Sequence, residues 1–131
     1  MASIHREISI DVSPEAAWDA LRDLGALHTR LVPGFVVDTK LEPGARTVTF
    51  GNGIVAREII VDVSEPARRV AWSSVGGVMT HHNASAQVFP EGTGTRFVWI
   101  ADLLPDAVAP QIAGMIDMAM PIIKKTLEGG R

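Results

Sequence analysis

Alternating apolar and polar positions occupy the first part of the chain and most of its middle, a period typical of β-strands that bury one face. Residues 3–12 alternate in this way. Six later segments also favour strands and are separated by turn signals such as Pro43-Gly44 and Gly51-Asn52-Gly53. The six later strands are expected over residues 35–41, 46–50, 54–63, 69–75, 81–89 and 95–103.

Helices are expected at two places, where apolar positions recur three and four residues apart. The first is capped by Ser13, runs over residues 14–24 and is followed by a short helical piece over residues 26–31. A long helix is expected over residues 105–127. One strand, two short helices, six strands and a long helix favour an antiparallel sheet with the last helix on its concave face.

Composition narrows the class of protein. The chain has 131 residues, which we expect to form a single domain over residues 1–131, and 47% of them are hydrophobic. A net charge of −3 without any basic cluster argues against nucleic acid as a partner. Cysteine is absent, and charged residues interrupt the first ten positions as they would not in a signal peptide. No apolar run is long enough for a membrane span, so we expect a cytoplasmic protein.

The segment GGVMTHHNASAQVF, residues 76–89, stands out because its strand carries polar side chains at alternate positions. Asn83, Ser85 and Gln87 share one face, and the residues between them share the other. The polar face is either wetted by solvent or lines an enclosed cavity. The second interpretation suggests a ligand cavity.

His81 and His82 suggest a metal site, but a regular strand points adjacent side chains to opposite faces. They therefore cannot bind one ion together, and we expect no metal. No phosphate loop or dinucleotide fingerprint is present, so we expect no cofactor. We place His81 at the rim of the cavity and the other histidine on the outer face.

Several local motifs accompany this order of elements. They are SPEAAWDAL at residues 13–21, VTFGNG at 48–53, RRVAW at 68–72 and TRFVWIADLLP at 95–105. Together they resemble the SRPBCC superfamily, which includes START-type lipid-transfer domains, birch-pollen-allergen-like proteins, plant abscisic-acid receptors and bacterial polyketide cyclase/dehydrase-like proteins. The resemblance covers the whole chain. It implies an α+β helix-grip fold, with a curved seven-stranded antiparallel sheet around a long C-terminal helix.

In this superfamily a ligand lies between the sheet and the last helix. The similarity to the abscisic-acid receptors is greatest over residues 57–85, and it places a gating loop at residues 51–53 and a latch at 77–81. Together with the apolar stripe of the last helix, it implies a set of ligand-binding residues. They are Glu58, Trp72, Ser74, His81, Asn83, Ser85, Ile112 and Ile116.

Glu58 has two interpretations. Facing an apolar cavity, it would serve as proton donor, base or hydrogen-bond acceptor for a ligand. Otherwise it forms an ion pair with Arg46, Arg57 or another basic residue on a neighbouring strand.

The leading hypothesis is a protein that binds a small hydrophobic or aromatic ligand, lipid- or polyketide-like, in a cavity of roughly 300–1,000 Å³. One alternative is a polyketide cyclase, aromatase or dehydratase that uses Glu58 and His81 as its acid–base pair. Another is a protein-interaction module with a collapsed cavity.

The sequence does not determine which face of the sheet Trp99 occupies, because both faces of the strand over residues 95–103 are apolar. An apolar outer face would suit a homodimer interface.

Overall fold

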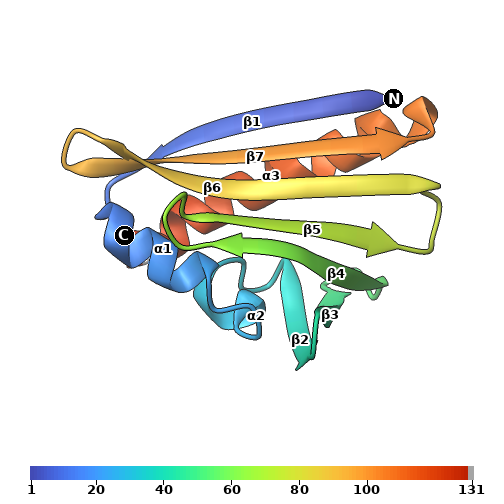
Figure 1. Ribbon diagram of the computed structural model, residues 1–131, viewed down its shortest axis with the longest axis horizontal. Coiled ribbons are helices and arrows are strands. Elements are labelled where there is room, and N and C mark those ends of the chain that lie inside the picture. Colours follow the sequence, from blue (N-terminus) through green and yellow to red (C-terminus); the bar gives the residue numbers. More distant parts are fainter. Residues whose placement is uncertain (130–131) are drawn as a thin grey trace.

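Seven strands form one antiparallel sheet in the computed structural model, which describes residues 1–129 (Figure 1). The order across the sheet is β1-β7-β6-β5-β4-β3-β2, so six strands form a meander and the first strand pairs with the last. Their bounds are β1 Ala2–Ile10, β2 Val36–Glu42, β3 Ala45–Phe50, β4 Val55–Ser64, β5 Arg69–Val75, β6 His81–Glu91 and β7 Gly94–Leu104. The predicted α+β fold, a curved seven-stranded sheet with a long C-terminal helix, is confirmed.

The two short helices follow β1, as expected. α1 (Pro14–Leu21) begins after Ser13, whose hydroxyl accepts a hydrogen bond from the backbone N–H of Ala16 at 3.2 Å. This helix ends at Leu21, three residues earlier than predicted. The four-residue α2 (Leu27–Arg30) follows it.

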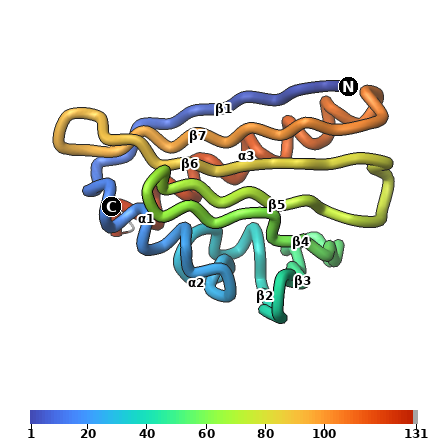
Figure 2. The backbone as a smooth tube through the Cα atoms, in the orientation of Figure 1, coloured from blue at the N-terminus to red at the C-terminus, as the bar shows by residue number. Residues whose placement is uncertain are grey.

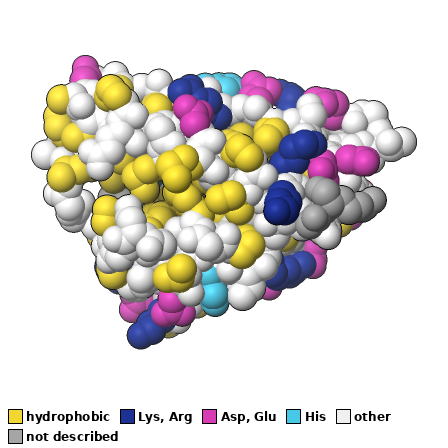
Figure 3. Space-filling model, turned by 180° about the vertical axis from the view of Figure 1, so that it is seen from behind, with side chains coloured by type: hydrophobic (Ala, Val, Ile, Leu, Met, Phe, Trp, Pro, Cys, Tyr) yellow, Lys and Arg dark blue, Asp and Glu magenta, His cyan; other side chains and the backbone are white. Residues whose placement is uncertain are grey.

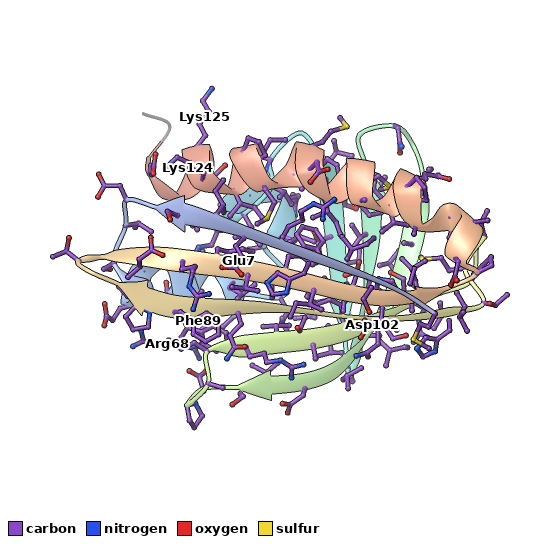
Figure 4. The ribbon with its side chains drawn as sticks, turned by 90° about the horizontal axis from the view of Figure 1, so that it is seen from above. Glu7, Arg68, Phe89, Asp102, Lys124 and Lys125 are labelled. Carbon is purple, nitrogen blue, oxygen red and sulfur yellow. The ribbon has the colours of Figure 1, made fainter. Side chains whose placement is uncertain are left out.

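The long helix begins with a 3-10 turn, η1 (Asp106–Val108), and continues as α3 (Ala109–Leu127). α3 runs along one face of the sheet and contacts β1 (Figure 4). The β6–β7 hairpin projects past its neighbours at one end of the molecule (Figure 2). Among residues 1–129, no helix is long and apolar enough to cross a membrane.

The core lies between the inner face of the sheet and α3. The apolar positions of α3 recur at intervals of three and four residues, so they form one buried stripe. That stripe meets inward side chains from the strands. The main buried members are Ile116, Ala119, Met120 and Ile123 of α3 with Ile4, Val48, Val70, Phe97, Ala101 and Leu103 of the sheet.

The face of β6 that meets the core is the one that alternates with Asn83, Ser85 and Gln87. Its buried residues are His82, Ala84, Ala86 and Val88. The strand register explains this choice, because Ala84 lies beside Trp72 of β5 and Ala86 lies beside Trp99 of β7. The small alanine side chains leave room on the inner face for two indole rings. The rings fill that room, because packed protein interiors tolerate little empty volume.

Asn83 and Ser85 therefore lie on the outer face of the sheet, and the expectation that they line the cavity is corrected by the register. Asn83 is paired with Asp102 of β7, and Ser85 with Ile100 of the same strand. Gln87 follows the same alternation and donates its side-chain N–H to the backbone oxygen of Ala67 at 3.1 Å. Ser85 is nevertheless buried on that outer face, where its register partners are Ala71 of β5 and Ile100 of β7.

The outer face of β7 offers little apolar surface. Val98 is buried and Ile100 is half-buried, and no large hydrophobic side chain of β7 is exposed. Trp99 points inward, which answers the question that the sequence left open. A homodimer remains a prediction, without an exposed apolar face on β7 to support it.

Gly51 holds the β3–β4 turn against the segment that precedes β2. Its N–H donates to the backbone oxygen of Phe35 at 2.9 Å, and a Cβ atom at this position would lie 2.4 Å from the backbone oxygen of Gly34. This close approach brings Phe35 and Phe50 into an edge-to-face contact, with ring centroids 5.6 Å apart.

Gly51→Ala is expected to lower the free energy of unfolding by about 1–3 kcal/mol, because the added methyl group must push the two backbone segments apart. Gly114→Ala is the matched control. It lies exposed in α3 with no atom within 4 Å of the added Cβ, and it should gain up to about 1 kcal/mol. Urea denaturation measures both. Equal effects of the two substitutions would contradict the close approach.

Candidate functional site

A cavity of about 180 Å³ lies between the sheet and α3. The β3–β4 turn contributes Ile54, and the loop that joins β5 to β6 contributes residues 76–79. On the face opposite to that of Figure 1, hydrophobic side chains gather around a hollow (Figure 3). A smaller cavity of about 70 Å³ lies beside the first, towards α1 and α2. The two share the lining residues Phe35, Phe50, Glu58, Trp72 and Trp99.

Both volumes are below the range of roughly 300–1,000 Å³ that is usual for small-molecule sites and that the sequence led us to expect. The space suits a compact molecule better than a long flexible chain.

Five of the eight predicted site residues line the larger cavity, and three do not. Those that line it are Glu58, Trp72, Ser74, Ile112 and Ile116. His81 is exposed and outside the lining, and Asn83 and Ser85 lie on the outer face. The prediction of His81 at the rim is therefore corrected. His82 lines the cavity in its place, because the strand period puts it on the same face as the alanines that neighbour the tryptophans.

Four polar residues on four adjacent strands form a row across the inner face of the sheet. We call Arg46, Glu58, Ser74 and His82 the polar row. Arg46 pairs with Glu58 in the β3–β4 register, and Glu58 pairs with Ser74 in the β4–β5 register. The backbone N–H of Ser74 donates to the ring of His82 at 2.9 Å. Sequence reasoning identified two members of this row and missed Arg46 and His82 as cavity neighbours.

The Arg46–Glu58 ion pair occupies the deep end of the polar row. Arg46 Nε donates to Glu58 Oε1 at 2.8 Å, and the two side chains are only 5% and 9% exposed. Arg46 also donates to the backbone oxygen of Leu24 at 3.3 Å and lies over the Trp72 ring, 5.7 Å from its centroid. Glu58 thus combines both of its predicted interpretations: it is paired with Arg46 and it lines the cavity.

His82 occupies the other end of the polar row, where β5 and β6 separate. Their ladder ends at the pair Trp72 and Ala84. Beyond it, Nδ1 of His82 accepts the Ser74 N–H, and the hydroxyl of Ser73 donates to the backbone oxygen of His82. A nitrogen that accepts from an amide carries no proton, so the neutral ring holds its proton on Nε2.

Burial lowers the pKa of His82, since the charged imidazolium would lose its hydration. The neighbouring His81 lowers it further by charge repulsion, whereas Asp102 of β7, labelled in Figure 4, acts in the opposite direction. The neutral ring is also the form that can accept the Ser74 N–H, so geometry and pKa agree.

The remaining walls of the larger cavity are mostly apolar. Trp72 and Trp99 pack edge to face with ring centroids 5.9 Å apart. Ile112, Met115 and Ile116 face them from α3. The exposed residues that line the cavity outside the strands include the hydrophobic Ile54 and Val78, together with Gln111 of α3.

Within residues 1–129, no group of three or more histidine, aspartate or glutamate side chains is arranged to hold a metal ion.

The fold is the START-like helix-grip fold. More specifically, the chain belongs to the family of polyketide cyclase / dehydrase and lipid transport proteins, whose model matches residues 1–129. No curated protein matches the sequence.

Solved structures share this fold at low sequence identity. Protein XoxI from Bacillus cereus is 19% identical, with 98% of this chain and 94% of that chain covered and a TM-score of 0.81. A truncated norcoclaurine synthase from Thalictrum flavum is 19% identical, with 99% and 95% covered and a TM-score of 0.73. A START superfamily protein from Mycobacterium smegmatis is 12% identical, with 97% and 94% covered and a TM-score of 0.71. At such identities the likeness shows the fold alone.

Removing one partner of the buried ion pair should be costly. Glu58→Gln or Arg46→Met is expected to lose about 3–5 kcal/mol of unfolding free energy, because the other charged group stays buried without its partner. The double variant should lose less than the sum of the two single variants. Arg57→Met with Glu42→Gln is the control, because this exposed pair joins β4 to the end of β2 and should couple by less than about 1 kcal/mol. Equal coupling energies in the two double-mutant cycles would contradict the stabilising role of the buried Arg46–Glu58 pair.

His82 should make stability depend on pH. Unfolded chains take up the histidine proton near pH 6.5, whereas the folded protein resists it until lower pH, so the unfolded state binds more protons in between. The contribution is therefore fully present above pH 6.5 and is lost as the pH falls from there towards the lower pKa of the folded state. Urea unfolding between pH 5 and 7 should show this loss in the parent and in His81→Asn, but not in His82→Asn. An NMR titration giving His82 a pKa above its ordinary value would contradict the assignment.

Proposed function

We propose that this protein binds a compact, neutral, largely apolar or aromatic molecule in the cavity between the sheet and α3. The observation that carries the proposal is a cavity with aromatic and aliphatic walls, a row of polar side chains on the sheet and one further polar residue, Gln111, on α3. Ligand sites in proteins typically have this composition, in which apolar walls supply burial and a few polar groups fix orientation.

The electrostatics of the lining favour a neutral ligand. Glu58 is balanced by Arg46, and His82 is held in its neutral form. The other residues that line the larger cavity carry no charge. An ionic ligand would lose its hydration on entry without meeting an uncompensated opposite charge, which is costly in a buried site.

The mouth of the cavity supports entry of an apolar molecule. Ile54 of the β3–β4 turn and Val78 of the loop between β5 and β6 both line the cavity and are exposed. Gly76 and Gly77 both have positive φ, a conformation in which glycine is free of steric cost. An apolar ligand therefore meets apolar surface before it is enclosed (Figure 3).

Binding is better supported than the two alternatives. A cyclase-type reaction using Glu58 and His81 lacks an assembled pair, because His81 is exposed outside the cavity and Glu58 is held by Arg46. A collapsed interaction module is disfavoured by the presence of a cavity of about 180 Å³. The family includes both cyclases and lipid transport proteins by its description, so membership leaves the choice to the site.

Filling the cavity from α3 should abolish binding of a two-ring probe such as 2-acetylnaphthalene. Ile112→Trp places an indole in the lining, whereas Met118→Trp places one on the exposed face of the same helix, where the methionine is 66% exposed. Equilibrium dialysis should show at least a tenfold loss of affinity for the first variant and none for the second. In parallel, the probe should raise the melting temperature of the parent and of Met118→Trp only. Unchanged affinity in Ile112→Trp would refute the proposed site.

A further inference from the structure

We propose that His82 recognises the polar end of the ligand: its Nε2–H donates a hydrogen bond to an acceptor oxygen such as a ketone carbonyl. This proposal rests on the binding function proposed above and names the chemical group that the same site selects. It arises from three features of the His82 ring, namely its position, its tautomer and its free nitrogen.

The position of the ring is fixed by the split between β5 and β6. His82 lies on the inner face of β6 and lines the larger cavity. Its side chain bonds to the backbone of β5 through Ser74, and its own backbone oxygen receives the hydroxyl of Ser73. The Ser74 bond therefore holds the ring and the Ser73 bond holds its backbone, and together they orient the ring with respect to the cavity.

The tautomer is fixed by a donor that cannot change its role. The Ser74 backbone N–H can only donate, so Nδ1 must accept, and the proton of the neutral ring resides on Nε2. His82 therefore offers the cavity a hydrogen-bond donor and never an acceptor. A hydroxyl or amide side chain in its place would be able to serve in either role.

Nε2 is the part of the ring that is open to a ligand. Among residues 1–129, Nε2 has no hydrogen-bond partner. Every fully enclosed side-chain nitrogen or oxygen in this part of the chain does have a partner, so Nε2 is not fully enclosed. Because His82 as a whole is only 7% exposed and lines the cavity, this accessible atom faces the cavity space.

Selectivity follows from the cost of leaving Nε2–H without an acceptor. Water can satisfy this group while the cavity is empty, but a ligand that fills the cavity displaces the water. A ligand with a well-placed acceptor restores the bond, and one without it leaves a buried donor unsatisfied, at a cost of about tenfold or more in affinity. Glu58, two strands away along the polar row, carries only acceptor oxygens, so the cavity offers a donor at His82 and an acceptor at Glu58.

Two matched probes test this directly. 2-Acetylnaphthalene carries a carbonyl acceptor, and 2-ethylnaphthalene has a side chain of similar size with none. By equilibrium dialysis, the parent protein should bind the acetyl compound about tenfold more tightly. Equal binding of both probes by the parent would overturn the role of His82 while leaving the binding function intact. Failure of both to bind would instead overturn the proposed function, and the present proposal with it.

Two substitutions separate the ring's two contacts. His82→Asn keeps an oxygen near the Nδ1 position for the Ser74 N–H but has no group at Nε2, so it should fold and lose the preference for the acetyl probe. His82→Gln carries an amide nitrogen near Nε2 but lacks the acceptor for Ser74, so it should keep the preference while melting at lower temperature. His81→Asn, on the outer face, should keep both the preference for the acetyl probe and the melting temperature of the parent. A preference that survives in His82→Asn would overturn the proposal.

Discussion

The packing of two tryptophans against two alanines determines how this sheet faces its own interior. Trp72 and Trp99 point inward from β5 and β7, and β6 lies between those strands. Their rings fit because Ala84 and Ala86 are their cross-strand neighbours. A strand has only two faces, so this requirement fixes every other side chain of β6 as well. His82 is thereby directed into the cavity, and its neighbour His81 is directed out of it.

The same constraint explains why buried polar groups are tolerated here. A charged pair and an imidazole inside a sheet are expensive unless each finds partners. Arg46 finds Glu58, the Leu24 carbonyl and the Trp72 ring, and His82 finds the Ser74 amide. Their bonds run from strand to strand, so the polar row also ties β3, β4, β5 and β6 together beside the cavity. A site that holds itself in shape in this way needs little rearrangement to receive a ligand.

Element order and strand boundaries were predictable, because local periodicity and turn residues determine them. Glu58 and Ser74 were predicted from the resemblance to the abscisic-acid receptors, and both line the cavity. The prediction of the site failed on β6, because both faces of this strand carry plausible site residues and the residues that select the inner face lie on β5 and β7. Single-strand periodicity cannot show that Trp72 and Trp99 flank β6. The alanine spacing opposite two tryptophans was nevertheless present in the sequence, and it was the signal that would have selected His82.

Ligand recognition and the stability of the fold both depend on His82. The bond that anchors its ring to Ser74 also decides which nitrogen carries the proton, so the backbone of β5 sets the chemistry that the cavity offers. Protonation of the ring would replace the acceptor at Nδ1 with a second donor facing the Ser74 N–H. The charges around it act in both directions, since His81 opposes protonation and Asp102 favours it, and Glu58 lies two strands away along the row. Loss of the Ser74–His82 bond would weaken the contact between β5 and β6 next to residues 76–79, which line the cavity. The donor that orients a ligand and the contact between these two strands therefore both depend on a neutral His82 ring.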